Sequence, residues 1–262
     1  MKSYVFIPSD LEAGKILGAA IYNPTMVAID GSYDDVNRLC SELADSYPWA
    51  FVNINVRPFY ADGSKTLGFE VAEQLGWRAP DHAVAPSASG AMFTKIYQGL
   101  KEFEATGIIS DVHTKMHSAQ ARGCSPIASA YEEGRFVIRP VKPSSLATSL
   151  AIGNPADGYY ALKVIEASGG SAVIAEENEI ADGVKLLAET EGIFTEGAGG
   201  VAITGLKRLV ETGKIKRDES VVVYITGNGL KTTELVADVV NPIHIEPNVE
   251  AFEEAMAART GK

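Results

Sequence analysis

Short apolar runs alternate with longer segments of helical period along most of the chain. Apolar runs that predict strands lie at residues 4–7, 26–29, 51–54, 83–85, 136–138, 172–175 and 221–225. Apolar residues recur at intervals of three and four, which predicts helices, at residues 11–22, 33–46, 66–75, 94–106, 155–168, 178–189 and 198–212. Strands that alternate with helices are typical of an α/β fold with a largely parallel sheet, in which each helix covers one face.

A loop-rich stretch at residues 55–63 marks the expected boundary between a small and a large unit. We therefore expect a remnant of a small α/β domain at residues 1–56, a large α/β domain at residues 57–246 and a C-terminal helix or tail at residues 247–262. The first unit offers only three strands and two helices. A parallel sheet needs neighbours that cover its edges, so this unit is small for an independent domain.

Composition and charge narrow the function classes. The 262 residues are 46% hydrophobic, enough for a sizeable core, and no apolar run approaches the ~18 residues that span a membrane. Met1 leads directly into the first strand-like run, so we expect a cytoplasmic enzyme and no membrane association. The net charge of −11 argues against a nucleic-acid partner, and any anionic substrate must be held by a local site.

The spacing of the cysteines and histidines along the sequence indicates neither a catalytic nucleophile nor a metal site. Cys40 and Cys124 lie far apart, so we expect two reduced thiols and assign neither as a nucleophile. The four histidines form no dyad or ligand set by spacing, although His113 and His117 are four residues apart. That pair lies where a strand is favoured over a helix, and we therefore expect no metal site.

A strand at residues 83–85 runs into a loop of small residues, Ser87 to Gly90, which opens a helix. Small side chains let backbone N–H groups approach an anion, and the helix N-terminus adds a partial positive charge. The loop is therefore a candidate phosphate site. Tight strand-to-helix turns also use small residues for packing alone, so the pattern by itself leaves both interpretations open.

Two further loops carry polar groups after predicted strands. Thr226 and Asn228 follow the strand at residues 221–225 between glycines, at the sheet edge where ligands of parallel sheets bind. The Thr226 hydroxyl could hydrogen-bond a heteroaromatic ring nitrogen, or it could cap the turn. In the stretch at residues 53–66, Arg57, Ser64 and Lys65 could clamp a phosphate or carboxylate, or could be solvated on the surface.

These three loops, in this order and at these separations, resemble the threonine synthases of the pyridoxal-phosphate-dependent fold type II family. The similarity reaches from Met1 to about Ala237 and is carried by residues 7–8 with 11–15, 62–66 with 69–77, 80–82, 88–90, 120–126, 149–156, 191–196 and 225–231. The most diagnostic segments are Ile152-Gly153-Asn154-Pro155, Glu191-Gly192-Ile193-Phe194-Thr195-Glu196 and Ile225-Thr226-Gly227-Asn228-Gly229-Leu230-Lys231.

The resemblance implies a tryptophan-synthase-β-like fold, with parallel or mixed sheets flanked by helices, and pyridoxal 5'-phosphate as the cofactor. It places Ala88, Ser89, Gly90, Ala91 and Met92 around the cofactor phosphate and Thr226 opposite the pyridine nitrogen, both in the domain at residues 57–246. It implies conversion of O-phosphohomoserine and water to threonine and phosphate by a homodimer. Arg57, Ser64 and Lys65 match a stretch near the substrate. Many members have Gly-Asn-x-Gly-Asn at positions 88–92, so backbone contacts must replace side-chain contacts here.

Two family motifs are missing from this sequence. Members carry a Ser-Phe-Lys-Asp-Arg-like motif, whose lysine forms the Schiff base, and a Ser-x-Gly-Asn-like turn that meets the ring hydroxyl; neither occurs here. No catalytic residue is therefore assigned. We expect an N-terminally truncated threonine synthase with no turnover as written, because the lysine holds the cofactor and moves protons at the substrate.

Other interpretations of the activity of the untruncated protein stay open. A related pyridoxal-phosphate lyase or β-replacement enzyme, such as a cysteate synthase or a threonine dehydratase, would share the three loops. A non-catalytic module that keeps the small-residue loop for an anion or a partner subunit would share them too. The substrate, and the presence or absence of a covalent cofactor bond, discriminate between these classes.

Overall fold

The computed structural model describes residues 1–53 and 58–260, which fall into two compact units, Met1–Thr232 and Thr233–Lys262. The first unit is an α/β structure with two sheets, both parallel. The expected parallel α/β fold is therefore confirmed. The second unit holds a 3₁₀ segment at Thr233–Val239 and the helix α10 (Val249–Thr260). The expected boundary at residues 56–57 lies outside the described residues.

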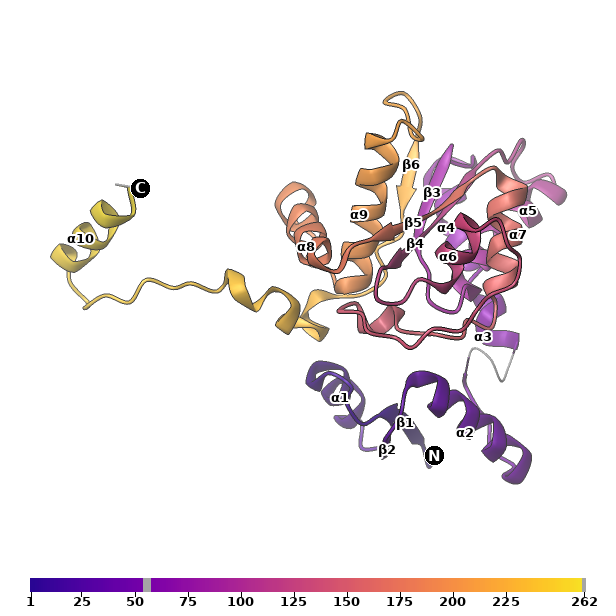
Figure 1. The fold of residues 1–262 in the computed structure, drawn as a ribbon, viewed down its shortest axis with the longest axis horizontal. Coiled ribbons are helices and arrows are strands. Elements are labelled where there is room, and N and C mark those ends of the chain that lie inside the picture. The colour runs from indigo at the N-terminus through magenta and orange to yellow at the C-terminus, as the bar shows by residue number, and fades with distance from the viewer. Residues whose placement is uncertain (54–57, 261–262) are drawn as a thin grey trace. The chain divides into compact units, whose positions relative to one another are not determined.

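The N-terminal segment forms a two-stranded parallel sheet (Figure 1). Strand β1 (Tyr4–Pro8) pairs with β2 (Thr25–Ile29), helix α1 (Ala13–Ala20) connects them, and α2 (Tyr33–Ser46) packs against β1. Helix α2 begins where the sequence predicts, because Ser32 and Asp35 form a capping box in which each side chain accepts from the other residue's N–H.

The larger sheet has the strand order β5-β4-β3-β6. Its strands are β3 (His82–Pro86), β4 (Lys115–Ala121), β5 (Ser171–Ala175) and β6 (Val221–Val223). The apolar runs predict three of these strands. Strand β4 was not among those runs, although the sequence favours a strand over a helix where His113 and His117 lie. The predicted strand at residues 136–138 is wrong, since that segment is irregular. Residues 51–53 are not strand either, and Ile54 lies outside the described residues.

Helices cover both faces of the larger sheet (Figure 1). One face carries α9 (Gly197–Glu211), with α8 (Glu177–Glu191) packed on it. The other face carries α5 (Ala91–Ala105), α6 (Pro126–Glu132) and α7 (Gly158–Ser168), and α4 (Thr66–Gln74) packs on α5. The expected loop at residues 55–63 is wrong in part, because α3 (Pro58–Gly63) is a short helix. Short 3₁₀ turns lie at Thr148–Leu150 and Gly229–Lys231.

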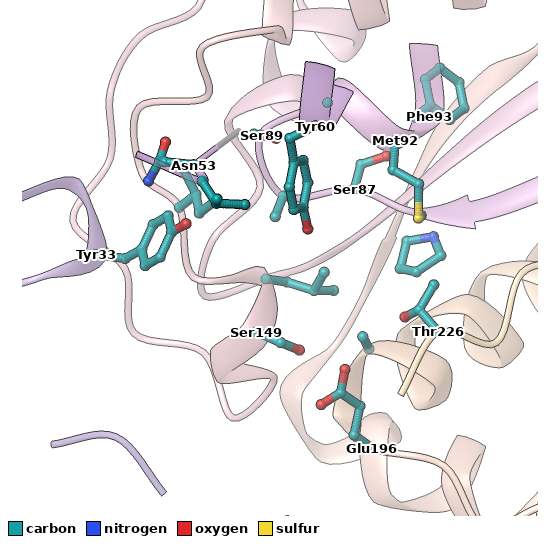
Figure 2. A pocket seen from close by; sticks show the side chains of 17 residues that line it. Tyr33, Asn53, Tyr60, Ser87, Ser89, Met92, Phe93, Ser149, Glu196 and Thr226 are labelled. Atoms are coloured by element: carbon teal, nitrogen blue, oxygen red, sulfur yellow. The ribbon is translucent and has the colours of Figure 1, made fainter. Parts of the chain in front are cut away.

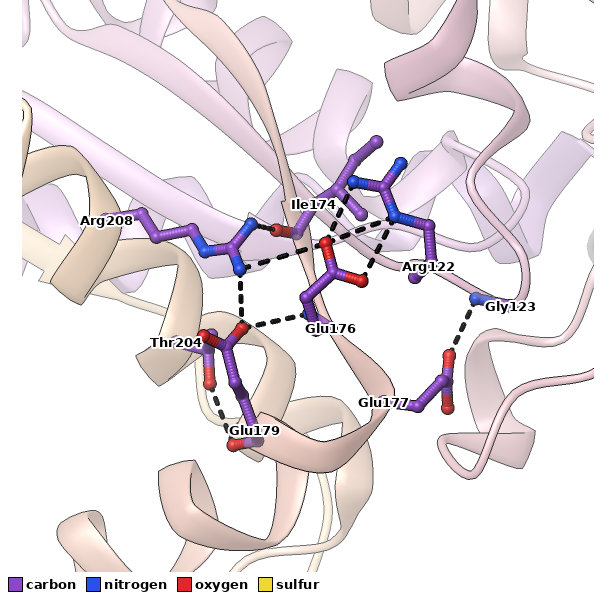
Figure 3. Close-up of polar contacts among 8 residues, drawn as sticks. All are labelled: Arg122, Gly123, Ile174, Glu176, Glu177, Glu179, Thr204 and Arg208. Carbon is purple, nitrogen blue, oxygen red and sulfur yellow. Dashed lines mark hydrogen bonds and ion pairs between the residues drawn. The ribbon is translucent and has the colours of Figure 1, made fainter.

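The start of α8 is tied to the ends of β4 and β5 by a polar network (Figure 3). Arg122, directly after β4, donates to both carboxylate oxygens of Glu176, at 2.9–3.2 Å. Arg208 on α9 pairs with Glu179 on α8 at 2.6 Å and donates to the Ile174 carbonyl of β5. These charges hold α8, α9 and the carboxyl edge of the sheet in one arrangement, next to the loops described below.

No helix of the described residues is long and apolar enough to cross a membrane. Both cysteines are buried free thiols, and burial raises the pKa of Cys124 to about 11. A thiol with so high a pKa stays protonated at neutral pH.

Candidate functional site

A cavity of about 320 Å³ opens at the carboxyl edge of the larger sheet (Figure 2). This edge is where parallel α/β sheets bind ligands. Strands β3 and β6 are neighbours, and Tyr224 N–H donates to the Val84 carbonyl at 2.9 Å, so the loops that follow the two strands lie side by side. The lining includes Ser87 to Gly90 and Met92 after β3, Thr226 after β6, and Glu196 before α9.

Four of the five residues expected around the cofactor phosphate line this cavity: Ala88, Ser89, Gly90 and Met92. The fifth, Ala91, is buried at the start of α5, where its N–H donates to Ser89 Oγ at 3.3 Å. Gly90 is the N-cap of α5 with a φ of 91°, a left-handed conformation that favours glycine. A Cβ atom at this position would also come within 2.9 Å of the Asp157 carbonyl oxygen. Glycine is therefore required here by both backbone conformation and space.

The small-residue loop, residues 87–90, is anchored through its carbonyl groups. Gln120 Nε2 donates to the Ser87 carbonyl at 3.0 Å, and the Asp157 N–H donates to the Ser89 carbonyl at 2.9 Å. The C=O and N–H of a trans peptide point in opposite directions. Anchoring these two carbonyls on the scaffold therefore turns the N–H groups of Ala88 and Gly90 the other way, as anion-binding loops require.

Ser87 lies in the loop that the sequence marks as a candidate phosphate site, but its hydroxyl was not assigned to the cofactor. Its side chain is 2% exposed and lines the cavity, and within the described residues its Oγ has no hydrogen-bond partner. A buried hydroxyl without a partner is costly unless a ligand satisfies it. Its place as the first residue of the small-residue loop, directly after β3, was the available signal. Ser87 Oγ, the loop and the first turn of α5 together fit a bound phosphate.

Thr226 and Glu196 reach the cavity from two segments that pack on each other. The turn after β6 pairs with the segment before α9: Glu196 N–H donates to the Gly227 carbonyl at 3.1 Å, and Thr195 Oγ1 donates to the same oxygen at 2.9 Å. A Cβ atom on Gly229 would come within 2.5 Å of the Phe194 ring. Two segments that carry the family resemblance thus meet at the cavity.

Glu196 was not assigned from the sequence. It is 7% exposed, and it lines the cavity together with Thr226. In the view of Figure 2 these two residues lie toward one end, and Tyr33 and Asn53 lie toward the other. Tyr60 and Ser149 also line the cavity. The described lining contains no lysine and no arginine.

Of the three residues expected near the substrate, the two that the structure describes, Ser64 and Lys65, are not brought into the cavity. Arg57 lies outside the described residues. Ser64 and Lys65 stand outside the cavity lining, and Lys65 forms ion pairs of 2.8 Å with both Asp62 and Glu102. These two carboxylates raise the pKa of Lys65 by hydrogen bonding. A role of Arg57, Ser64 and Lys65 near the substrate stays a prediction.

Burial changes the pKa of one carboxyl group beside the small-residue loop, that of Asp157. The side chain of Asp157, at the N-cap of α7, is partly buried, and this raises the pKa of its carboxyl group while Lys95 opposes the shift.

A family model described as pyridoxal-phosphate dependent enzyme matches residues 1–227. The chain is 39% identical to the threonine synthase of Methanocaldococcus jannaschii over 232 residues, which are 88% of this chain and 57% of that protein. It is 37% identical to the threonine synthase of Methanosarcina acetivorans over 255 residues, which are 96% of this chain and 62% of that protein. The chain therefore spans about three fifths of the length of these two relatives.

Solved structures support the fold. A maize serine racemase superposes with a TM-score of 0.69 at 15% identity, covering 91% of this chain and 69% of that one. The processed form of threonine deaminase isoform 2 from Solanum lycopersicum gives a TM-score of 0.70 at 17% identity, covering 92% and 67%. The expected fold type II architecture is confirmed by these neighbours.

Proposed function

We propose that this chain, which belongs to the family of pyridoxal-phosphate-dependent enzymes, binds pyridoxal 5'-phosphate in the cavity and forms part of a threonine synthase. The observation that carries the proposal is the small-residue loop with its anchored carbonyls, the partnerless Ser87 hydroxyl, and Thr226 across the same cavity. The similarity to curated relatives named threonine synthase supports the choice of this activity. The reaction would convert O-phosphohomoserine and water to threonine and phosphate, by a homodimer in the cytoplasm.

The chain's own residues would bind and orient the cofactor. The N–H groups of Ala88 and Gly90, with Ser87 and Ser89, hold the phosphate, and the first turn of α5 adds its partial positive charge. Thr226 presents a hydroxyl to the pyridine nitrogen. A neutral hydroxyl, unlike a carboxylate, does not force that nitrogen to stay protonated. When bound, the cofactor supplies an electron sink for the carbon chemistry of the substrate.

We further propose that the 262-residue chain has no turnover alone. The described cavity lining offers no lysine amine, and Lys65 is engaged by two carboxylates outside that lining. Proton transfer at the substrate carbons requires a positioned base, and the lysine of the family normally supplies it. Binding of the cofactor by this chain should therefore be non-covalent.

The test compares two preparations in the same assay. The native protein, isolated from its own cells, should contain pyridoxal phosphate and release threonine and phosphate from O-phosphohomoserine. The purified 262-residue chain should bind the cofactor, show no single lysine labelled stoichiometrically by mass spectrometry after borohydride treatment, and release neither product. A native protein that deaminates threonine but does not release phosphate from O-phosphohomoserine would instead indicate a dehydratase.

A further inference from the structure

We propose that Gln120 is a positioning residue for the phosphate of the bound cofactor, acting through the backbone of Ser87. This inference rests on the proposed cofactor binding. Gln120 does not line the cavity, and its side chain is 0% exposed. It lies in β4, the strand beside β3, with its amide beneath the small-residue loop.

Both ends of the Gln120 amide form hydrogen bonds with backbone groups. Its Nε2 donates to the Ser87 carbonyl at 3.0 Å, and its Oε1 accepts from the N–H groups of Ile127 and Ala128, each at 2.9 Å. The two backbone N–H donors fix which end of the amide is oxygen. An amide nitrogen in that place would face two other donors, and none of the three groups would have an acceptor. One side chain thus connects the small-residue loop to the start of α6.

Ser87 is held on its other side as well. Its N–H donates to the Ala119 carbonyl at 2.9 Å, the last bond between the neighbouring strands before the loop. With its N–H on Ala119 and its carbonyl on Gln120, the peptide that links Ser87 to Ala88 has one orientation. The Ala88 N–H is therefore turned away from Gln120, and Ala88 lines the cavity.

The consequence is a phosphate site that is formed before the ligand arrives. If the Ser87 carbonyl lost its donor, the peptide could rotate and would present a carbonyl oxygen in place of an N–H to the phosphate. Preorganised donors bind anions more tightly than donors that must be ordered on binding. Loss of the Gln120 donor should then weaken binding of the phosphate group specifically, and leave contacts to the pyridine ring unchanged.

The experiment compares pyridoxine 5'-phosphate with pyridoxine on the full 262-residue chain by calorimetry at pH 8.5. Neither probe has an aldehyde, so no lysine is needed. The dissociation constant of pyridoxine divided by that of pyridoxine 5'-phosphate measures how much the phosphate group contributes to binding. Gln120→Glu keeps an oxygen for the Ile127 and Ala128 N–H groups and, as a carboxylate, removes the donor to Ser87. Gln120→Met removes both functions at similar volume.

We expect the wild-type ratio to fall roughly tenfold in both variants, with the pyridoxine dissociation constant unchanged. Gln98→Glu is the matched control, because it removes a glutamine donor bond to Glu102 on α5 without touching the small-residue loop, and it should keep the wild-type ratio. Circular dichroism identifies folded variants. A folded Gln120→Met variant with the wild-type ratio overturns the role of Gln120, whereas a wild-type chain that binds the two probes equally contradicts the proposed cofactor site itself.

Discussion

Gly227 packs so closely on Glu196 that a Cβ atom at residue 227 would overlap the Glu196 carboxyl group. The two residues are also joined through their backbones, because the Glu196 N–H donates to the Gly227 carbonyl at 3.1 Å. Thr226, directly before this glycine, lines the cavity beside Glu196. The position of the Thr226 hydroxyl therefore depends on a close approach that only glycine allows.

Gly227→Ala should destabilise the chain by about 1–3 kcal/mol, because the added methyl group must displace a buried carboxylate or the turn itself. Urea unfolding measures this change. Adding Glu196→Ala should recover much of the loss, so the double variant is less destabilised than the sum of the single ones. Gly18→Ala, where a Cβ meets nothing within 4 Å, is the control and should not destabilise. Strict additivity of the two variants would contradict the contact.

Gly90→Ala should both destabilise the chain and weaken the binding of pyridoxine 5'-phosphate. The backbone conformation alone costs ~1–2 kcal/mol for an alanine, and the contact with the Asp157 carbonyl adds to it. Gly134→Ala separates the two causes, because Gly134 has a φ of 63° and open space around its Cβ position. We expect a smaller loss of stability and no loss of ligand affinity for Gly134→Ala. Equal effects of both substitutions in unfolding and binding titrations would exclude a role of the Asp157 contact.

Strand β4, which was not among the apolar runs of the sequence, shows what hydrophobic periodicity cannot detect. Strand β4 is buried along nearly its whole length, yet it carries His117, Ser118 and Gln120. An apolar pattern does not reveal such a strand, because the partners that satisfy these polar groups, such as Ser87 for Gln120, come from distant parts of the chain. The apolar spacing predicted the helix at Tyr33–Ser46 to its ends, and the capping box that fixes its start is formed by residues close in sequence, Ser32 and Asp35.

Some features of the candidate site can likewise be predicted from the sequence, and others cannot. The small-residue loop and Thr226 are predictable because strand-to-helix loops mark the carboxyl edge of a parallel sheet. Lys65 was predicted near the substrate from its neighbours in sequence, but only the folded chain reveals Asp62 and Glu102 around it. The wrong strand at residues 136–138 has a similar cause: Ile138 joins the apolar core and Phe136 contacts Tyr159, so these apolar side chains pack without entering the sheet.

Glu177 should control the order of the loop that follows residue 143. Its carboxylate accepts from the N–H groups of Gly123 and Leu146, each at 2.7 Å, and from Ser145 Oγ at 3.2 Å (Figure 3 shows the Gly123 bond). Glu177→Gln replaces one acceptor oxygen with a donor, so one backbone N–H loses its partner. We expect faster hydrogen exchange at residues 144–152 and weaker ligand binding, since Ser149, Leu150 and Ile152 line the cavity.

Glu189→Gln is the matched control for this prediction, since Glu189 lies exposed on the same helix. It should leave the exchange rates at residues 144–152 at the wild-type values. Unchanged exchange in Glu177→Gln, measured by mass spectrometry at matched stability, would mean that the loop is held by other contacts.

Acid should destabilise the chain through a buried pair of histidines. His82 Nδ1 lies 2.9 Å from His117 Nε2, the rings are stacked, and His117 Nδ1 lies 2.9 Å from Ser171 Oγ. The spacing of the histidines along the sequence did not reveal this pair, which the neighbouring strands β3 and β4 bring together. Burial, with smaller contributions from His82 and nearby lysines, lowers the pKa of His117 to about 4.

The direction of the effect follows from proton binding in the two states. The unfolded chain protonates this histidine near the ordinary pKa of about 6.5, whereas the folded chain resists until about pH 4. Between these values the unfolded state binds more protons, so stability is complete above pH 6.5 and is lost as the pH falls. Urea unfolding should show a loss of about 2 kcal/mol between pH 7.5 and pH 5 from this group. His117→Asn should reduce that loss, while His113→Asn, at an exposed position, should retain it. Equal pH dependence in His117→Asn and the wild type would assign the acid sensitivity to the carboxylates instead.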